Sequence, residues 1–274
     1  MSARAADTRT GRRPARVRLD ELLVARGLAP TRARAQALVL AGRVRTGTGD
    51  AARSDRKPGD LVHPDTQLEV PEPEPYVSRG GRKLAAAIDA FGIEVAGLVC
   101  LDVGASTGGF TDVLLQRGAT RVYALDVGRG QLADALRRDP RVVAIERTNA
   151  RSLTAGAFPE PIDLGVIDVS FISLALVLGP VASTLRSTGS IVALVKPQFE
   201  AGRGKAPKGV VRDPAVHRQV LLDVTAAARE VGLGTRDILR SPITGAQGNR
   251  EFLAWLAAGP SCAELAEQIE AVAS

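Results

Sequence analysis

Apolar residues in the middle of the chain gather in short runs that are separated by longer mixed segments. Val, Ile and Leu dominate these runs, which is typical of strands covered on both faces of a sheet. The runs occur at residues 98–103, 122–125, 142–145, 164–168 and 191–195. Because the segments between them are long enough for helices, the alternation predicts an α/β fold with a doubly wound parallel sheet.

Near the N-terminus, apolar residues follow the three-to-four spacing of amphipathic helices. Residues 19–23 form one such stripe, and Gly27 is expected to end that helix. Thr31 is placed to cap a second helix, with a stripe at residues 35–39 and a left-handed stop at Gly42. A small sheet is expected to complete this module, from apolar positions at 44, 61–62 and 68–70.

The segment 71–75 has the sequence PEPEP. Alternating prolines favour an extended, semi-rigid chain, so this segment marks a domain boundary. Beyond it, a stripe at residues 84–91 predicts a helix that Lys83 opens. The chain is thus predicted to consist of a disordered basic arm (1–17), a small α+β module (18–70), a linker (71–77) and a larger α/β domain (78–274).

Composition limits where the protein acts. The 274 residues are 45% hydrophobic, enough for one sizeable core and a small second module. Cys100 and Cys262 fit reduced thiols better than a disulfide, because Cys100 lies inside an apolar run. No apolar run approaches the roughly 20 residues of a membrane span, and the N-terminus lacks the apolar region of a signal peptide. We therefore expect a cytoplasmic protein with no membrane partner.

The net charge of +6 is unevenly distributed. Residues 1–60 hold 14 Lys and Arg against 6 Asp and Glu, a net charge of +8, which leaves −2 for the rest of the chain. Such a positive field attracts polyanions such as nucleic acids. The alternative is a solvated basic surface without a partner.

The most informative segment is LDVGASTGGF at residues 101–110. It is typical of a buried strand that ends in Asp102 and continues into a glycine-rich turn, with Thr107 placed to cap the next helix. In open α/β sheets the ligand crevice lies at this carboxyl edge. From Gly104 the glycines follow G-x-x-x-G-G, so the G-x-G-x-x-G fingerprint of a dinucleotide site is not met.

A second acid favours a particular kind of ligand. Asp126 ends the next apolar run roughly 20 residues further on, where the acid that contacts ribose hydroxyls is expected. Two acids without a pyrophosphate cradle suit a cationic nucleoside, and S-adenosylmethionine is such a ligand. The alternative is an ordinary tight turn capped by Asp102. A nicotinamide dehydrogenase is the least favoured interpretation, because its third glycine is missing.

Four charged residues come from four separate predicted elements: Lys83, Asp168, Lys196 and Glu251, the last just before a predicted edge strand. Such a set suits methyl transfer to a ribose hydroxyl, a poor nucleophile whose proton must be removed. A lysine amine removes a proton only where burial or a second cation favours its neutral form. We therefore assign Lys196 as the base and Lys83 as that cation, with both acids orienting the ammonium groups and the ribose. The alternative is an ordinary ion-pair cluster.

The N-terminal module resembles the S4 RNA-binding domain. The resemblance covers about residues 18–70 and is carried by RLDELLVARGLAPTRARAQALVLAGRV at 18–44 and PGDLV at 58–62. It implies that the two helices and a following strand grip structured RNA through shape and phosphate contacts, in agreement with the charge. The basic residues expected to face RNA are Arg18, Arg32, Arg34 and Arg43.

Over about residues 18–256 the chain resembles the TlyA family, whose members were once named hemolysins. The motifs that carry the resemblance are VSRGGRKL, LDVGASTGGF, LDVG, ERTNAR, DVSFIS, LVKPQFE and GNREF. The resemblance implies an S4 domain joined to a Rossmann-like catalytic domain of the FtsJ type. It further implies S-adenosylmethionine-dependent 2′-O-methylation of cytidine ribose in 23S ribosomal RNA, and in some members 16S, at an intersubunit bridge that affects capreomycin and viomycin sensitivity.

The resemblance also implies roles for individual residues. The family's catalytic tetrad falls on Lys83, Asp168, Lys196 and Glu251. Its cofactor site falls on Asp102, Gly104, Ala105, Ser106, Thr107, Gly108, Phe110, Asp126 and Asn149, of which Asp126 matches the ribose acid and Asn149 lies beside the adenine. The linker departs from the R-x-W-V of mycobacterial members, because residues 74–77 are EPYV. Coupling of RNA to cofactor through the linker is therefore not carried over.

Two other functions stay open. A membrane-active hemolysin needs an amphipathic or apolar insertion element, which the sequence does not show. A non-catalytic S4 protein with a degenerate cofactor domain would bind RNA without binding S-adenosylmethionine. His63 and His217 are interpreted as surface or turn residues, and Trp255 as a core residue. We expect no metal, because no metal-ligand spacing occurs, and a monomer, because nothing in the sequence requires a dimer.

Overall fold

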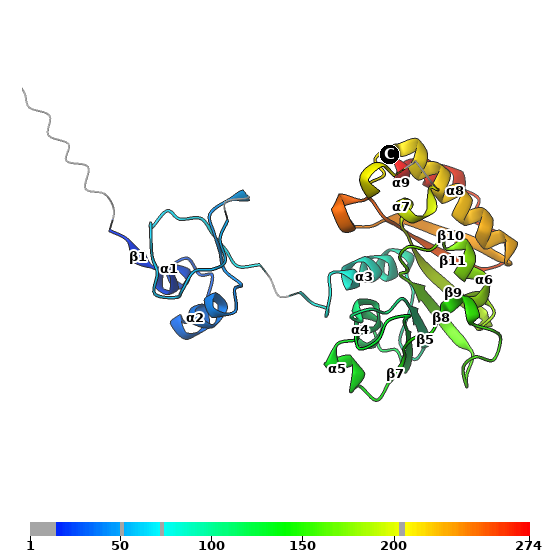
Figure 1. Cartoon of the computed structure of the whole chain (residues 1–274), viewed down its shortest axis with the longest axis horizontal. Coiled ribbons are helices and arrows are strands. Elements are labelled where there is room, and N and C mark those ends of the chain that lie inside the picture. The colour runs from blue at the N-terminus through cyan, green and yellow to red at the C-terminus, as the bar shows by residue number, and fades with distance from the viewer. Residues whose placement is uncertain (1–14, 50–51, 72–73, 203–205) are drawn as a thin grey trace, which may run out of the picture. The chain divides into compact units, whose positions relative to one another are not determined.

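The computed structural model describes residues 15–49, 52–71, 74–202 and 206–274 (Figure 1). The chain forms two compact units that divide after Pro73, inside the predicted linker segment. Most of the predicted basic arm, residues 1–14, lies outside the described residues. Within that predicted arm, Val17 already belongs to a strand, because it pairs with Val62.

The N-terminal unit packs two short helices against short antiparallel strands. Its elements are β1 (Val17–Arg18), α1 (Leu19–Ala25), α2 (Arg32–Leu40), β2 (Arg45–Thr46), β3 (Leu61–Val62) and β4 (Leu68–Glu69). β1 pairs with β3 and β2 with β4, so the predicted small sheet forms as two separate pairs. As predicted, Thr31 caps α2 by accepting a hydrogen bond from the Arg34 N–H at 3.2 Å, and Gly27 and Gly42 have positive φ angles.

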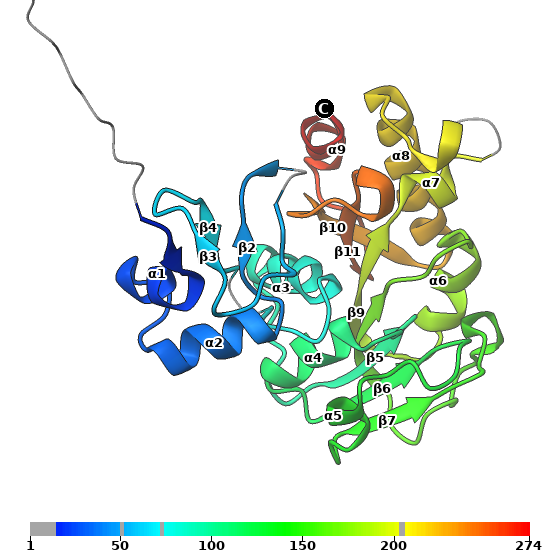
Figure 2. The ribbon, with the colours of Figure 1, turned by 60° about the vertical axis from the view of Figure 1, so that its left-hand side comes forward.

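The C-terminal unit is built on a seven-stranded sheet in the order β10-β11-β9-β8-β5-β6-β7 (Figure 2). Its strands are β5 (Val99–Val103), β6 (Arg121–Leu125), β7 (Val142–Ile145), β8 (Ile162–Ile167), β9 (Leu185–Val195), β10 (Leu233–Arg240) and β11 (Phe252–Ala258). The five strands from β9 to β7 are parallel, as the alternation of runs predicts.

The helices of this unit are α3 (Gly80–Phe91), α4 (Gly109–Gln116), α5 (Asp134–Arg137), α6 (Ala175–Ala182), α7 (Pro197–Glu200), α8 (Pro214–Glu230) and α9 (Leu265–Ala273). Helix α3 precedes the first strand of this unit, α9 follows its last strand, and the other helices lie between strands in the chain. Short 3-10 helices occur as η2 (Ala150–Ser152), η3 (Pro207–Gly209) and η4 (Ala246–Gly248).

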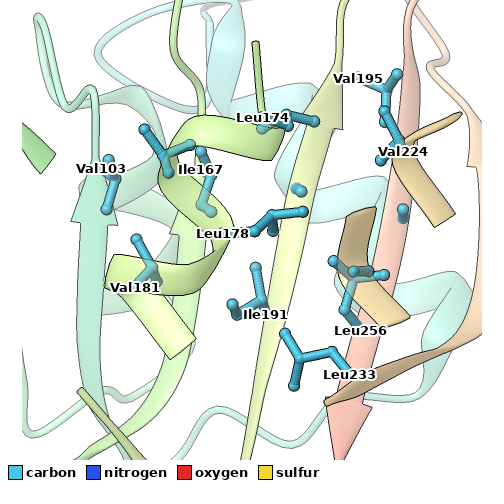
Figure 3. Packing of buried hydrophobic residues seen from close by; sticks show 14 of the residues in the cluster. Val103, Ile167, Leu174, Leu178, Val181, Ile191, Val195, Val224, Leu233 and Leu256 are labelled. Carbon is cyan, nitrogen blue, oxygen red and sulfur yellow. The ribbon is translucent and has the colours of Figure 1, made fainter. Parts of the chain in front are cut away.

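Successive strand residues point to opposite faces of the sheet and enter two cores. Leu101 and Val103 of β5 pack in the core that includes α6, α8 and α9. Cys100, the residue before Leu101, points to the opposite face and packs with α3 and α4. Figure 3 shows the first core, where Leu178 of α6 lies among strand residues such as Ile191. Burial on both faces explains why the predicted runs are apolar throughout.

The sheet is not parallel throughout. β11 runs antiparallel to both β9 and β10 and lies between them. The prediction of an edge strand after Glu251 is therefore wrong, because β10 takes the edge position. The sequence of β10 contains no apolar run, because polar residues interrupt it. Its pairing with β11 also shifts register between Thr235 and Asp237.

The interpretation of His217 as a surface or turn residue is also wrong. The side chain is fully buried on α8, where its Nε2 donates a hydrogen bond to the Val211 carbonyl oxygen at 3.1 Å. Its ring meets Phe252 edge-on, with centroids 5.5 Å apart. Position 217 shares a helical face with Val220 and Val224, a spacing that indicates burial. Trp255 packs as predicted, with its ring stacked on a core aromatic.

Candidate active site

The parallel strands end together at one edge, and the chain changes direction there. From β5 it continues to β6 and β7 on one side, then returns to β8 on the other side. The switch point therefore lies between β5 and β8, where open α/β sheets bind their ligands. Asp102 of β5 and Asp168, directly after β8, lie at this point.

Asp102 organises the start of α4. Its Oδ2 accepts hydrogen bonds from the Thr111 N–H at 2.9 Å and from the Thr111 hydroxyl at 2.7 Å. The predicted cap by Thr107 is wrong: α4 begins at Gly109, Gly108 holds the cap position with a φ of 95°, and Asp102 satisfies the helix amide instead. Burial raises the pKa of Asp102 to about 7, against the lowering effect of the Thr111 hydrogen bonds.

Two glycines of the turn are required by close packing. Gly104 has a φ of 84°, and a Cβ there would overlap the backbone carbonyl of Asp168. Gly108 has a φ of 95°, and a Cβ there would overlap the side chains of Leu132 and Leu136. Only glycine allows this backbone to approach β8 and α5 so closely.

A cavity of about 500 Å³ lies along the carboxyl ends of β5, β6 and β8. Among its lining residues are Gly104, Ser106, Asp126 and Asn149 of the predicted cofactor set. The Asp126 carboxylate accepts hydrogen bonds from the backbone N–H groups of Ser106 at 2.8 Å and Gly128 at 2.6 Å. This second acid is therefore fixed against the glycine-rich turn and lines a largely apolar cavity.

A second cavity, of about 300 Å³, adjoins the first through three shared residues: Gly104, Ser106 and Asp168. Its lining includes the remaining turn residues of the predicted set except Gly108, namely Asp102, Ala105, Thr107 and Phe110, together with Lys83. The predicted cofactor residues thus divide between two adjoining cavities, except Gly108, which packs against Leu132 and Leu136.

The four predicted catalytic residues form two ion pairs. Lys196 Nζ lies 2.5 Å from Asp168 Oδ1, and Lys83 is paired with Glu251. Only 11% of each lysine side chain is exposed, so both cations are largely removed from water. Asp168 lines both cavities and Lys83 the smaller one. Each lysine therefore has its own carboxylate close to the switch point.

Asn249 is a residue of this region that the sequence analysis missed. Its buried side chain donates hydrogen bonds to the carbonyl oxygens of Gly209 at 2.8 Å and Ala246 at 3.0 Å, and accepts one from the Val211 N–H at 3.0 Å. Gly245 and Ala246 line the smaller cavity. Asn249 therefore holds one wall of that cavity. Its position two residues before Glu251 is the sequence feature that could have indicated this role.

In the N-terminal unit, a buried acid gathers two of the predicted RNA-facing arginines. Asp20 is fully buried and accepts hydrogen bonds from Arg18 at 3.0 and 2.9 Å, Arg32 at 3.1 Å and Gln36 at 2.9 Å. Arg34 is exposed at the start of α2. The hydrogen bonds from Arg18, Gln36 and Arg32 hold the pKa of Asp20 far below its ordinary value. Asp20 was missed because its contacts are distant in sequence.

The fourth predicted RNA-facing residue, Arg43, donates a hydrogen bond to the Pro71 carbonyl oxygen at 2.8 Å. The second half of the predicted linker belongs to the C-terminal unit. There the Val77 N–H donates to Asp112 at 2.8 Å, and a Cβ on Gly81 would overlap the ring of Tyr76. Residues 74–77 are thus attached to α3 and α4.

This fold, with a charged edge beside two cavities, defines a methyltransferase of the FtsJ-like class. A family model described as FtsJ-like methyltransferase matches residues 76–258, and a model of the S4 domain matches residues 17–46. With the relatives reported next, these matches show that the chain belongs to the TlyA family.

The chain is similar to 16S/23S rRNA (cytidine-2′-O)-methyltransferase TlyA of Mycobacterium tuberculosis, with 49% identity over 88% of this chain and 90% of that protein. It is 41% identical to Hemolysin A of Brachyspira hyodysenteriae, over 87% and 98% of the two chains. A solved structure from Streptococcus thermophilus, described as a hemolysin, is 43% identical, covers 94% and 96%, and gives a TM-score of 0.71. In the described part of this chain, no helix is long and apolar enough to cross a membrane.

Proposed function

We propose that this protein uses S-adenosylmethionine to methylate the 2′-hydroxyl of a cytidine in ribosomal RNA. The observation that carries the proposal is the position of Asp168, which lines both cavities and forms the ion pair with Lys196. A lysine paired with a carboxylate therefore lies beside a nucleoside-sized pocket. The activity after which the Mycobacterium tuberculosis relative is named supports cytidine in 16S and 23S rRNA as the target.

The larger cavity fits a cationic nucleoside. We assign Asp126 to the ribose hydroxyls and the wall near Asn149 to the adenine. The glycine-rich turn and Asp102 face the smaller cavity, which we assign to the methionine part. The second oxygen of Asp102 is buried and has no hydrogen-bond partner among the described residues, so it is available to an ammonium group.

When bound, S-adenosylmethionine supplies an electrophilic methyl group on a sulfonium sulfur. The chain's own residues hold the ribose oxygen in line with that group and remove its proton. We assign Lys196 as the proton acceptor and Asp168 as the carboxylate that stabilises the ammonium formed. We assign Lys83 as the second cation of the site, and Glu251, its ion-pair partner, holds Lys83 in place.

The N-terminal unit supports RNA as the substrate. Arg18 and Arg32 are fixed by hydrogen bonds to Asp20, and Arg34 is exposed at the start of α2. A fixed guanidinium group loses less conformational entropy when it contacts a phosphate. We propose that these arginines and Arg43 hold structured ribosomal RNA through its backbone.

Transfer of tritium from labelled S-adenosylmethionine to purified ribosomal subunits tests the proposal. The subunits come from a strain that lacks the modification. Wild-type protein is expected to label RNA, Lys196→Ala to lose the label, and Arg229→Ala, at an exposed position on α8, to keep it. Absence of label in both subunits with wild-type protein contradicts the proposal.

Two further measurements separate the alternatives. Calorimetry with S-adenosylmethionine in the presence of ribosomal RNA distinguishes the enzyme from a non-catalytic S4 protein, which would give no binding heat. Leakage of dye from liposomes distinguishes it from a membrane-active hemolysin. We expect cofactor binding and no leakage.

A further inference from the structure

The turn α7, directly after Lys196, contacts the segment 168–174 at both of its ends. At the first end, Lys196 Nζ donates a hydrogen bond to the Ser170 hydroxyl at 2.9 Å, in addition to its ion pair with Asp168. At the other end, Glu200 accepts a hydrogen bond from the Ser173 hydroxyl at 2.6 Å. One short turn therefore fastens the segment that follows β8 at two places.

Glu200 directs both carboxylate oxygens to this segment. Oε2 accepts from the Ser173 hydroxyl, and Oε1 accepts from the Leu174 N–H at 2.9 Å. The Leu174 side chain is buried in the core at the start of α6 (Figure 3). Burial raises the pKa of Glu200, against the lowering effect of these two hydrogen bonds. The partly buried carboxylate is thus tied to a residue of the hydrophobic core.

Between the two anchors the backbone is strained. Phe171 has a φ of 63°, and its ring packs on Phe199 of α7 with centroids 4.8 Å apart. A left-handed conformation at a non-glycine residue is unfavourable and persists only where the surroundings hold it. The hydrogen bonds at Ser170 and Ser173 lie on either side of this residue. Together with the packing of Phe171 on Phe199, these hydrogen bonds hold the strained segment along the larger cavity.

We infer that Glu200 is a positioning residue that, through Ser173 and Leu174, fixes Lys196 relative to Asp168. Lys196 and Glu200 lie at opposite ends of one turn, which is closed by hydrogen bonds from the Phe199 N–H to the Lys196 carbonyl and from the Ala201 N–H to the Pro197 carbonyl, both at 2.9 Å. Because the turn moves as a body, holding Glu200 against the segment that carries Asp168 also holds Lys196. The effect on methyl transfer rests on the proposed function.

Loss of the Glu200 anchor leaves the ion pair of Lys196 and Asp168 in place but removes the second point that defines its geometry. A displacement of about 1 Å at reacting groups can cost about a hundredfold in rate. We therefore expect Glu200→Ala to lower kcat, normalised to the concentration of cofactor-binding sites, by roughly tenfold to a hundredfold. The KM for S-adenosylmethionine should stay nearly unchanged.

The test combines amide hydrogen exchange with kinetics on the full chain. Exchange in residues 168–174 is expected to be faster in Glu200→Ala and in Ser173→Ala. Glu200→Gln should restore both exchange and kcat, because its amide oxygen can still accept from the Leu174 N–H and its NH₂ can donate to Ser173. Glu230→Ala, at an exposed glutamate on α8, is the matched control and should behave as wild type.

Failure of the inference about Glu200 can be distinguished from failure of the proposed methyl transfer. Unchanged exchange in both Glu200→Ala and Ser173→Ala overturns the inference, and so does faster exchange with an unchanged kcat per binding site. If Glu200→Ala does not fold, Ser173→Ala decides by the same readouts. A wild-type protein that binds S-adenosylmethionine but transfers no methyl group contradicts the proposed function, and the exchange result then decides alone whether Glu200 anchors the segment.

Discussion

Val195 of β9 pairs with Phe252 of β11 in antiparallel register. The next residue after Val195 is Lys196, and the residue before Phe252 is Glu251, so both reach the same edge of the sheet. β8 runs parallel to β9 and also ends at this edge, directly before Asp168. The register of three strands, rather than any local motif, therefore brings three of the four charged residues together. Lys83 joins them from α3 by its ion pair with Glu251.

The buried pair of Lys83 and Glu251 should show strong coupling in stability. Lys83 is 8% exposed and Glu251 3%, so Glu251→Leu leaves a buried ammonium without its carboxylate. We expect this variant to lower the free energy of unfolding by about 3–5 kcal/mol, and the double variant with Lys83→Met to recover most of the loss. Urea denaturation of the four proteins measures the coupling. Additive losses would show that the two side chains do not depend on each other.

The close approach at Gly104 should make this position intolerant of alanine. Gly104→Ala adds left-handed strain of about 1–2 kcal/mol and overlap with the Asp168 carbonyl, for which overpacking costs about 1–3 kcal/mol more. Gly130 is the matched control, since its φ is 68° and a Cβ there meets nothing within 4 Å. Chemical denaturation is expected to show the larger loss at Gly104. Equal losses at both positions would remove the argument from packing.

Asp102 should make the stability of the C-terminal unit depend on pH. Its pKa is raised to about 7, whereas an unfolded aspartate has a pKa of about 4, so between these values the folded state holds more protons. Stability from this group is therefore greatest at low pH and falls as pH rises toward 7, by up to about tenfold in the unfolding constant per pH unit. Denaturation from pH 5 to 8 should show wild type losing stability relative to Asp102→Asn. Parallel curves would contradict this.

Asp20 should be the main polar anchor of the N-terminal unit. Asp20→Ala removes hydrogen bonds to Arg18, Arg32 and Gln36, and we expect a loss of about 2 kcal/mol. Since these groups lower its pKa, the stabilisation is present at neutral pH and is lost as pH falls below about 4. Hydrogen exchange in α1 and α2 measures the change. Asp55→Ala, at an exposed pair with Arg53, is the control and should leave exchange unchanged.

The sequence predicts the parallel half of the sheet well, for a physical reason. A strand buried on both faces has to be apolar throughout, and each of the five predicted runs overlaps one of the strands β5 to β9. In the antiparallel part, the sequence predicts β11 but not β10, because Arg236 and Asp237 interrupt the apolar pattern of β10. Without β10, β11 is wrongly predicted to lie at the edge of the sheet. Contacts distant in sequence decide such cases.

The candidate site divides in the same way. Charged residues after apolar runs indicated the edge at which Asp168 and Lys196 meet. The partners of individual side chains were not accessible from spacing: Asp102 caps α4 in place of Thr107, and Glu200 contacts Ser173 across 27 residues. Hydrogen bonds of this kind depend on the folded geometry. The roles of the site residues therefore stay predictions to be measured.

The most direct measurement is mass spectrometry of nucleosides from ribosomal RNA after incubation of unmodified subunits with the protein and S-adenosylmethionine. We expect 2′-O-methylcytidine with wild-type protein, a rate at least about a hundredfold lower with Lys196→Ala, and an unchanged rate with Arg229→Ala. Absence of 2′-O-methylcytidine with wild-type protein, or an equal rate with Lys196→Ala, would refute the proposed methyl transfer.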